Sequence, residues 1–234
     1  MNSLFIIPAR GGSKGIPYKN IKEFYGKPLI YYSLDLARQF TSDVNICIST
    51  DDKKIIECVN DYKYKVPFIR PMELSTDESG TYDVLKHALI HYNSIGENYD
   101  NIILLQPTSP IRKKEHINDS LNLFSTNIDM VVSVKESDAN PYYNLFEEDH
   151  NGYLIKSKKG KYTRRQDCPK VWEYNGSIYL INTSSLLKYD SFGDFTKKKK
   201  YLMSQLYSID IDNQLQWDFA EFIYNKIQNK EIIE

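Results

Sequence analysis

The sequence predicts an α/β protein with three layers (α/β/α), in which helices cover both faces of a mostly parallel, mixed central sheet. Two observations lead to this fold class. Short apolar runs recur along the chain, as in strands that are buried on both faces. Segments with apolar residues at helical spacing separate most of these runs, as in repeated strand–helix units. Ligands of such sheets bind at the carboxyl ends of the strands.

The first half of the chain carries this alternation clearly. Pro28 suits the first turn of a helix, and Leu29, Tyr32 and Leu36 follow at helical spacing. Residues 50–52 provide the cap of a second helix. The expected strands are residues 4–7, 44–49, 66–69, 101–105 and 130–134, and the expected helices begin near residues 28, 52, 81 and 114.

The second half interrupts the alternation with an irregular segment. Residues 140–172 are rich in Tyr, Lys and Arg, and residues 142–147 and 152–156 are interpreted as a small hairpin. The lysine run at residues 197–200 is interpreted as a solvated loop. We predict a single domain, residues 1–234, with an excursion at about residues 140–172. The elements expected after it are strands at residues 177–181 and 207–211 and a closing helix at residues 215–227.

The composition is typical of a soluble globular protein, with 41% hydrophobic and 26% charged residues. A net charge of −1 argues against a broad nucleic-acid-binding surface, so an anion site must come from local clustering of cations. Cys47, Cys58 and Cys168 have no metal-ligand spacing and favour a reduced, cytoplasmic protein. No secretory signal and no apolar run of roughly 20 residues, as needed to span a membrane, is found.

A glycine-rich, cationic loop follows the first expected strand. Lys14 precedes a glycine and not Ser or Thr, so the loop is not a Walker A motif, and its glycines do not form G-x-G-x-x-G. Glycines let backbone N–H groups turn inward, and flanking cations would then help to hold a polyphosphate. The alternative is a surface turn with solvated charges. The glycines and cations are Arg10, Gly11, Gly12, Lys14, Gly15 and Lys19.

Three polar segments fall on the rim where the strands are expected to end. Arg70 lies before a proline that keeps the backbone extended, and the Gln106 amide can both donate and accept hydrogen bonds. The alternatives are a surface salt bridge for Arg70, a cap in the following turn for Gln106, and a simple turn at Asn175 and Gly176. The convergence of the three segments on one rim indicates a ligand site more strongly than any one segment does. The three segments are residues 10–20, 70–81 and 106–112.

The strongest candidate for metal binding is the pair Asp210 and Asp212. In the expected strand the two carboxylates would share one face, while Ile209 and Ile211 share the other. Two carboxylates suit Mg²⁺, whose other ligands are usually waters and substrate phosphates. The alternative is that Asp212 simply caps the closing helix, and Asp210 is then the better candidate ligand.

Six cations lie within residues 156–165, in the irregular excursion: Lys156, Lys158, Lys159, Lys161, Arg164 and Arg165. A solvated hairpin and a cap over an anionic site or a partner's surface are equally good interpretations. From the residues alone, the chain is predicted to be a Mg²⁺-dependent enzyme that acts on a nucleoside polyphosphate or a sugar phosphate.

Seven segments of the chain resemble the acylneuraminate cytidylyltransferases, the CMP-sialic acid synthetases. The segment at residues 7–15 and the Gln-Pro-Thr-Ser-Pro run at residues 106–110 are highly specific together. The related synthetases for Kdo have a different first loop and fit less well. The matching segments are residues 7–15, 19–21, 48–51, 70–71, 104–112, 175–179 and 209–212.

The resemblance implies a nucleotide-diphospho-sugar transferase fold and a homodimer. It implies a reaction in which CTP and a nonulosonic acid, a nine-carbon 2-keto-3-deoxy sugar acid, give the CMP-sugar and pyrophosphate. The anomeric hydroxyl of the sugar attacks the α-phosphorus, so charge stabilisation on the triphosphate matters more than a covalent intermediate.

The resemblance also implies roles for single residues. The catalytic group would be Arg10, Lys14, Asp210 and Asp212, with both aspartates on Mg²⁺ and one of them helping to deprotonate the attacking hydroxyl. Arg10, Ser13 and Lys14 would hold the triphosphate, with Lys19 close by. Asn20 and Arg70 would recognise the nucleotide, and the backbone up to Thr81 would border the cytosine. Gln106 would touch the sugar acid, and Asn175 is counted with the substrate-binding residues.

In this family the excursion carries the dimer contact and lends basic residues to the neighbouring site, which matches Arg165. Residues 140–144 and 163–166 look closer to members that act on legionaminic- or pseudaminic-type acids. Two other functions are weighed: a sugar nucleotidyltransferase with another base or sugar phosphate, and a non-catalytic nucleotide-binding protein. The presence of the four predicted catalytic residues argues against the last.

Overall fold

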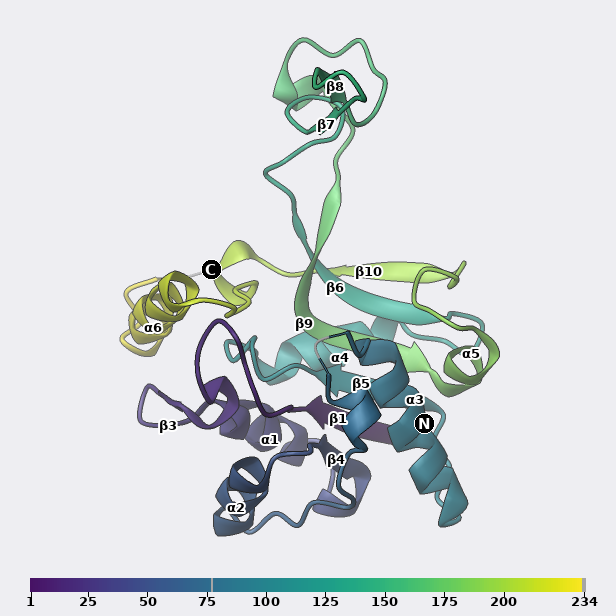
Figure 1. The fold of residues 1–234 in the computed structure, drawn as a ribbon, viewed down its shortest axis with the longest axis vertical. Coiled ribbons are helices and arrows are strands. Elements are labelled where there is room, and N and C mark those ends of the chain that lie inside the picture. Colours follow the sequence, from purple (N-terminus) through teal and green to yellow (C-terminus); the bar gives the residue numbers. More distant parts are fainter. Residues whose placement is uncertain (77, 233–234) are drawn as a thin grey trace.

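A six-stranded sheet organises the computed structural model, which describes residues 1–76 and 78–232 (Figure 1). In spatial order the strands are β10 (Lys198–Leu202), β6 (Met130–Glu136), β9 (Trp172–Asn182), β5 (Asn101–Leu105), β1 (Ser3–Pro8) and β4 (Ile46–Ser49). Only β9 runs antiparallel to its neighbours among the six. The predicted mostly parallel, mixed sheet is therefore confirmed.

Helices cover both faces of this sheet. Successive residues of β1 serve two separate cores, because Phe5 and Ile7 face one and Leu4 and Ile6 face the other. The predicted three-layer class is confirmed. Helices that pack in the first core are α1 (Leu29–Arg38), α2 (Lys53–Asp61), α4 (Lys114–Leu123) and α6 (Gln214–Gln228), and those in the second are α3 (Thr81–Ser94) and α5 (Thr183–Lys188).

The strand expected at residues 207–211 is absent, which corrects that prediction. Residues 205–207 form a short 3-10 helix, and the chain that follows is irregular. The backbone N–H of Ile211 donates to the Thr108 carbonyl, and the Ile211 carbonyl accepts from Lys19 Nζ. Bonds to a loop and to a side chain thus replace a strand partner. Ile209 and Ile211 are still buried, as expected from the alternation.

Two other predictions of local structure are wrong. The lysine run at residues 197–200 is not a loop, because most of it lies in β10, an edge strand that pairs in parallel with β6. Exposed lysines are common on edge strands, where they discourage pairing with other chains. The strand expected at residues 66–69 is reduced to a single bridge between Thr50 and Ile69.

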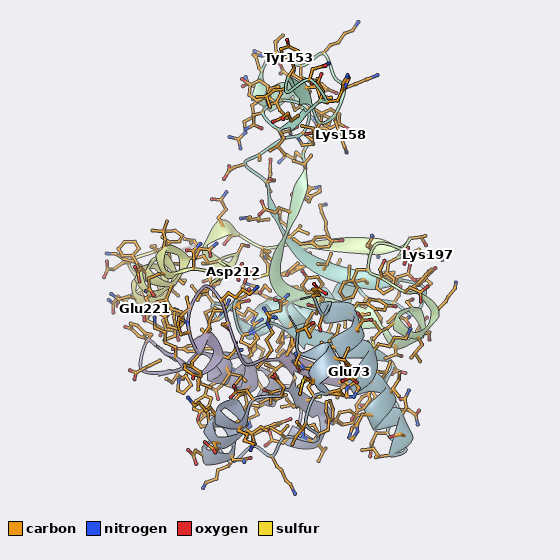
Figure 2. The ribbon with its side chains drawn as sticks, viewed as in Figure 1. Glu73, Tyr153, Lys158, Lys197, Asp212 and Glu221 are labelled. Atoms are coloured by element: carbon orange, nitrogen blue, oxygen red, sulfur yellow. The ribbon has the colours of Figure 1, made fainter. Side chains whose placement is uncertain are left out.

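The excursion projects from the sheet on the extended ends of β6 and β9 (Figure 1). Its hairpin consists of β7 (Phe146–Glu148) and β8 (Leu154–Lys156), which confirms the predicted hairpin with shifted bounds. Figure 2 shows Tyr153 and Lys158 on this projection, well away from Asp212. A smaller pair, β2 (Glu23–Phe24) and β3 (Lys27–Pro28), follows the glycine-rich loop.

The other helix and strand predictions agree with the structure to within a few residues. Cys47, Cys58 and Cys168 are free thiols. Within residues 1–76 and 78–232, no helix combines the length and the apolar character that crossing a bilayer requires.

Candidate active site

The glycine-rich loop forms one wall of a cavity of about 290 Å³. Pro8 ends β1 and Gln106 follows β5, so the cavity lies at the carboxyl ends of two neighbouring parallel strands, where ligands of such sheets bind. Seven of the predicted site residues come together there. They are Arg10, Ser13, Lys14, Lys19, Asn20, Gln106 and Asp212.

The loop is pressed against the segment that carries the two aspartates. A Cβ atom on Gly15 would lie 1.9 Å from the Asp212 carbonyl oxygen, so only glycine allows this approach. Lys19, itself buried, donates from Nζ to the Ile211 carbonyl at 2.6 Å and to Oδ1 of Asp212 at 3.1 Å. These contacts join the two ends of the chain into one site.

Hydrogen bonds also hold the loop from its other side. Arg10 donates from Nη1 to the Thr76 carbonyl, and Asn20 donates from Nδ2 to the Arg10 carbonyl. The Gly11 N–H donates to Oδ1 of Asp51 at 3.1 Å. The loop is therefore a built wall of the cavity and not a free surface turn.

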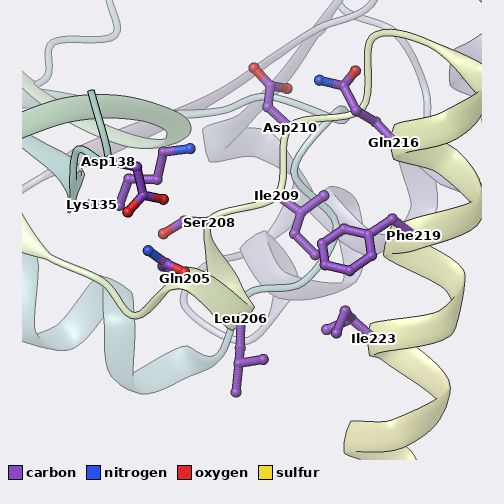
Figure 3. A pocket seen from close by; sticks show the side chains of 10 residues that line it. All are labelled: Lys135, Asp138, Gln205, Leu206, Ser208, Ile209, Asp210, Gln216, Phe219 and Ile223. Atoms are coloured by element: carbon purple, nitrogen blue, oxygen red, sulfur yellow. The ribbon is translucent and has the colours of Figure 1, made fainter. Parts of the chain in front are cut away.

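Asp210 lies on the other side of this segment, in a second cavity of about 310 Å³ (Figure 3). Leu206, Ile209, Phe219 and Ile223 form its apolar side. Asp210 lines this second cavity and Asp212 lines the first, so the two carboxylates face neighbouring spaces. The alternation expected of a strand does not apply to them, because the segment is irregular.

Burial raises the pKa of Asp210 above its ordinary value, and the nearby Asp212 carboxylate adds to this effect. Thr108, Lys19 and Arg112 act in the opposite direction, because they favour the ionised carboxylate. Oδ1 of Asp210 is buried and, among the described residues, has no hydrogen-bond partner. A buried carboxylate oxygen of this kind is suited to accept a cation or a proton.

The donor set is compatible with Mg²⁺. In the part of the chain that the structure describes, no group of three or more His, Cys, Asp or Glu side chains could hold a metal. Asp210 and Asp212 would therefore supply only two protein ligands, and waters and phosphate oxygens would complete the shell. This sparse protein contribution is characteristic of Mg²⁺ in phosphoryl-transfer sites.

Asp212 does not cap the closing helix α6, which was its alternative role. The N-cap of α6 is the next residue, Asn213. Asn213 accepts from the backbone N–H of Gln216, and the Gln216 side chain accepts from the Asn213 N–H. Asp212 keeps a side chain that is 69% exposed toward the first cavity.

Besides Arg165, three predicted substrate-binding residues do not line the first cavity. Arg70 is buried, and its guanidinium donates to Oγ and to the carbonyl of Ser49. Burial lowers the pKa of Arg70 to about 10. Thr81 is the first residue of α3 and is partly buried. Asn175 is buried in β9 and bonds to other protein groups. Contact of these three residues with a substrate stays a prediction.

Arg165 lies in the excursion and pairs with Asp138 of its own chain at 2.9 Å. Asp138 lines the Asp210 cavity (Figure 3). Its ion pair with Arg165 therefore brings Arg165 near the rim of that cavity. A role of Arg165 in a neighbouring subunit stays a prediction.

Arg112 lines neither cavity but lies beside the site, and sequence reasoning did not single it out. It donates to the Ser177 carbonyl at 2.8 Å and to the Ser33 hydroxyl, and its Nε atom is buried. Burial lowers the pKa of Arg112 to about 9, and the Asp210 carboxylate opposes this shift. The only signal in the sequence was its position at the end of the segment 104–112.

Comparison with known proteins gives a family match over nearly the whole chain. The model of the cytidylyltransferase family matches residues 4–230. The chain belongs to the cytidylyltransferase family. The resemblance inferred from the motifs is thereby confirmed.

Three relatives of this cytidylyltransferase are similar to it over more than nine-tenths of its length. It is 35% identical over 92% of its length to the N-acylneuraminate cytidylyltransferase of Streptococcus agalactiae, of which it spans about half (51%). It is 33% identical to the CMP-N,N'-diacetyllegionaminic acid synthase of Legionella pneumophila, with 94% of this chain and 95% of that protein covered. It is 31% identical to the pseudaminic acid cytidylyltransferase of Campylobacter jejuni, with 96% and 97% covered.

Solved structures agree on the fold. A CMP:2-keto-3-deoxy-manno-octonic acid synthetase solved with CTP superposes with a TM-score of 0.70 at 16% identity, covering 99% of this cytidylyltransferase and 100% of that chain. A 4-diphosphocytidyl-2C-methyl-D-erythritol synthase from Anaerococcus prevotii gives 0.63 at 15% identity, covering 96% and 98%. The predicted nucleotide-sugar transferase-like fold is confirmed.

Proposed function

We propose that this cytidylyltransferase transfers CMP from CTP to the anomeric hydroxyl of a nonulosonic acid. The oxygen–phosphorus bond forms at the α-phosphorus as the bond to the β-phosphate breaks, and pyrophosphate leaves. The names of the streptococcal, Legionella and Campylobacter relatives support this reaction class. Their three different acids leave the choice among sialic, legionaminic and pseudaminic acid to experiment.

One observation carries the proposal: the cationic loop and an aspartate face the same cavity. Arg10, Ser13 and Lys14 line this cavity and are proposed to hold the triphosphate, while Lys19 bonds the loop to Asp212. Preorganised cations at the phosphates stabilise the charge that develops in the transition state, without reorganisation during the reaction. Gln106 lines the same cavity and supports the predicted contact with the sugar acid.

Asp210 and Asp212 are proposed to hold Mg²⁺. When bound, the ion would neutralise phosphate charge and orient the triphosphate. We also propose that one of the two aspartates takes the proton of the attacking hydroxyl. Asp210 is our candidate, because its Oδ1 atom is buried and has no hydrogen-bond partner among the described residues.

A homodimer is also part of the proposal. Both strands of the excursion hairpin are exposed along their whole length, including Phe146, Leu154 and Ile155. An isolated two-stranded hairpin is marginally stable in water, so a covering partner would stabilise it. Sedimentation equilibrium of the full chain and of a Phe146→Asp, Leu154→Asp double variant tests this point, because the double variant should be monomeric.

The test of the activity is a pyrophosphate-release assay with two arms. CTP, UTP, GTP and ATP are compared at a fixed acid, and sialic, legionaminic and pseudaminic acids are compared at fixed CTP, each with Mg²⁺ and with EDTA. We expect release with CTP, with one acid preferred, and none after chelation. Equal use of another nucleotide would contradict cytidylyl transfer, and undiminished release in EDTA would contradict the metal assignment.

A further inference from the structure

The longest strand, β9, contains a bulge beside Asp210. The β6–β9 ladder pairs Val132 with Tyr179 and Val134 with Tyr174, so only Ser133 of β6 faces residues 175–178 of β9. Gly176, within this bulge, has φ +72°, a left-handed conformation. Bulges commonly re-aim a strand next to an active site.

The bulge is in close contact with the carboxylate of Asp210. A Cβ atom on Gly176 would lie 2.7 Å from Oδ2 of Asp210, so the carboxylate rests directly on the bulge. The Ser177 carbonyl in the same bulge accepts from Nη1 of Arg112. The buried Arg112 guanidinium therefore bonds to the bulge on which the Asp210 carboxylate rests.

Asn175 connects this bulge to the segment that carries Asp210. Its Oδ1 accepts from the Ser133 hydroxyl at 2.6 Å and from the Ser177 N–H at 3.2 Å. Its Nδ2 donates to Oγ of Ser208 at 2.9 Å and faces Sδ of Met203 at 3.4 Å. Asn175 is only 3% exposed. One side chain thus ties β6, the bulge and residues 203–208 together.

The contacts of Ser208 extend the connection. Ser208 is buried, its hydroxyl also donates to the Ser204 carbonyl at 2.7 Å, and it stands two residues before Asp210. The segment has no strand partner in this region, since residues 208–213 are irregular. Its position therefore depends on a few specific bonds, of which that from Asn175 is fully buried.

We propose that Asn175 is a positioning residue, which holds the Ser208–Asp210 segment on the β9 bulge and so sets the place of the Asp210 carboxylate. This inference rests on the proposed role of Asp210 and replaces a direct substrate contact for Asn175. Residues that orient a metal ligand from behind typically alter metal affinity or activity by about 10–100-fold when they are replaced.

The test compares three variants of the full chain. Asn175→Ala removes the connection, Ser208→Ala removes its far end together with the bond to the Ser204 carbonyl, and Thr183→Val is the matched control. Thr183 is also buried and also bonds through its hydroxyl, to the Tyr99 carbonyl at 2.8 Å, but it follows the opposite end of β9. All three variants should lower the thermal midpoint modestly.

The first readout needs neither metal nor substrate. Hydrogen–deuterium exchange over residues 203–212 should become faster in Asn175→Ala and Ser208→Ala and remain as in wild type in Thr183→Val. Unchanged exchange in the first two variants would overturn the proposal whatever the activity of the protein. Failure of wild type to release pyrophosphate would instead contradict the proposed function alone.

The second readout is the metal. The Mn²⁺ concentration for half-saturation, followed by electron paramagnetic resonance with CTP present, should rise about tenfold in Asn175→Ala and Ser208→Ala. The KM for the sugar acid at saturating metal should stay unchanged. A higher KM for the acid in Asn175→Ala but not in Ser208→Ala would show that Asn175 binds the substrate directly, and would overturn the positioning role.

Discussion

Nζ of Lys19 lies 3.1 Å from Oδ1 of Asp212, although 193 positions of sequence separate the two residues. Asp212 is largely exposed, so the ion pair itself contributes little to stability. The consequence of the ion pair is geometric, because it fixes one carboxylate against the glycine-rich loop.

Lys19→Met should therefore impair catalysis more than folding. We expect turnover to fall by about 10²–10³-fold, as when one preorganised donor is lost from an active site. Lys22→Met is the control, since Lys22 also joins this part of the chain to α6, through Gln214 and the Trp217 ring, but does not line the cavity. Steady-state kinetics measures the turnover of both variants, and thermal melting measures their stability. Equal turnover in the two would contradict the role of Lys19.

Gly15→Ala should displace the loop. The new Cβ would meet the Asp212 carbonyl, a backbone atom that cannot move aside cheaply. We expect a loss of about 1–3 kcal/mol in the free energy of unfolding, together with weaker CTP binding. Gly193→Ala is the control, because its new Cβ would approach only the flexible Ser191 hydroxyl at 3.2 Å. Denaturant titration and calorimetric CTP binding test this expectation, and wild-type values for Gly15→Ala would show that the loop is less constrained than its contacts indicate.

Lys14→Ala should lower turnover by about 10²-fold or more, because a positioned charge on the transferring phosphate would be lost. Lys14 is exposed, so the thermal midpoint should stay near that of wild type. Lys65→Ala, which removes an exposed lysine outside the cavity, should retain full activity. Near-normal turnover of Lys14→Ala would remove the loop from the catalytic machinery.

Arg165→Ala should weaken the sugar acid more than CTP. A guanidinium that faces a carboxylate can form a bidentate pair, and Arg165 stands near the rim of the Asp210 cavity. The KM for the acid should rise while the KM for CTP stays constant. Arg164→Ala is the control, because Arg164 is also largely exposed but pairs with Asp167 within the excursion. An equal effect on both substrates, or none, counts against the proposed contact.

Asp129 makes stability depend on pH at the opposite end of the sheet. Burial opposes ionisation, but hydrogen bonds from the Ser185 hydroxyl and from the N–H groups of Thr196 and Lys197 outweigh it and lower the pKa of Asp129. A lowered pKa stabilises the folded state above the unfolded value of about 3.9, and this contribution is lost as the pH falls through the folded value.

Asp129→Asn should therefore reduce the free energy of unfolding by about 1–3 kcal/mol at neutral pH. The difference from wild type should begin to shrink below about pH 4, where the unfolded chain starts to bind a proton at Asp129, and should be lost as the pH falls through the lower folded pKa. Asp61→Asn, at an exposed position, should show no such difference. Denaturant titrations at several pH values measure both variants, and a deficit that persists unchanged in acid would point to lost packing instead of lost charge.

Much of the fold follows from local patterns in the sequence. The strands at 4–7, 101–105 and 130–134 and the closing helix were predictable. Apolar runs mark strands that are buried on both faces, and helical spacing of apolar residues marks helices, so both signals lie within short stretches of sequence. The strand expected at 207–211 failed although Ile209 and Ile211 alternate correctly. Its backbone groups bond to Thr108 and Lys19, and no local pattern encodes those distant partners.

The same division applies to the site. By itself the sequence determined the cationic loop, the Asp210 and Asp212 pair and the family, because glycines, charges and motif spacing are local properties. Only the tertiary structure decided that Lys19 anchors the loop to Asp212, and that Asn175 lies behind Asp210 and outside the loop cavity. Such relationships depend on the tertiary fold, which brings segments that are distant in sequence within hydrogen-bonding distance. They exist only once the sheet has formed.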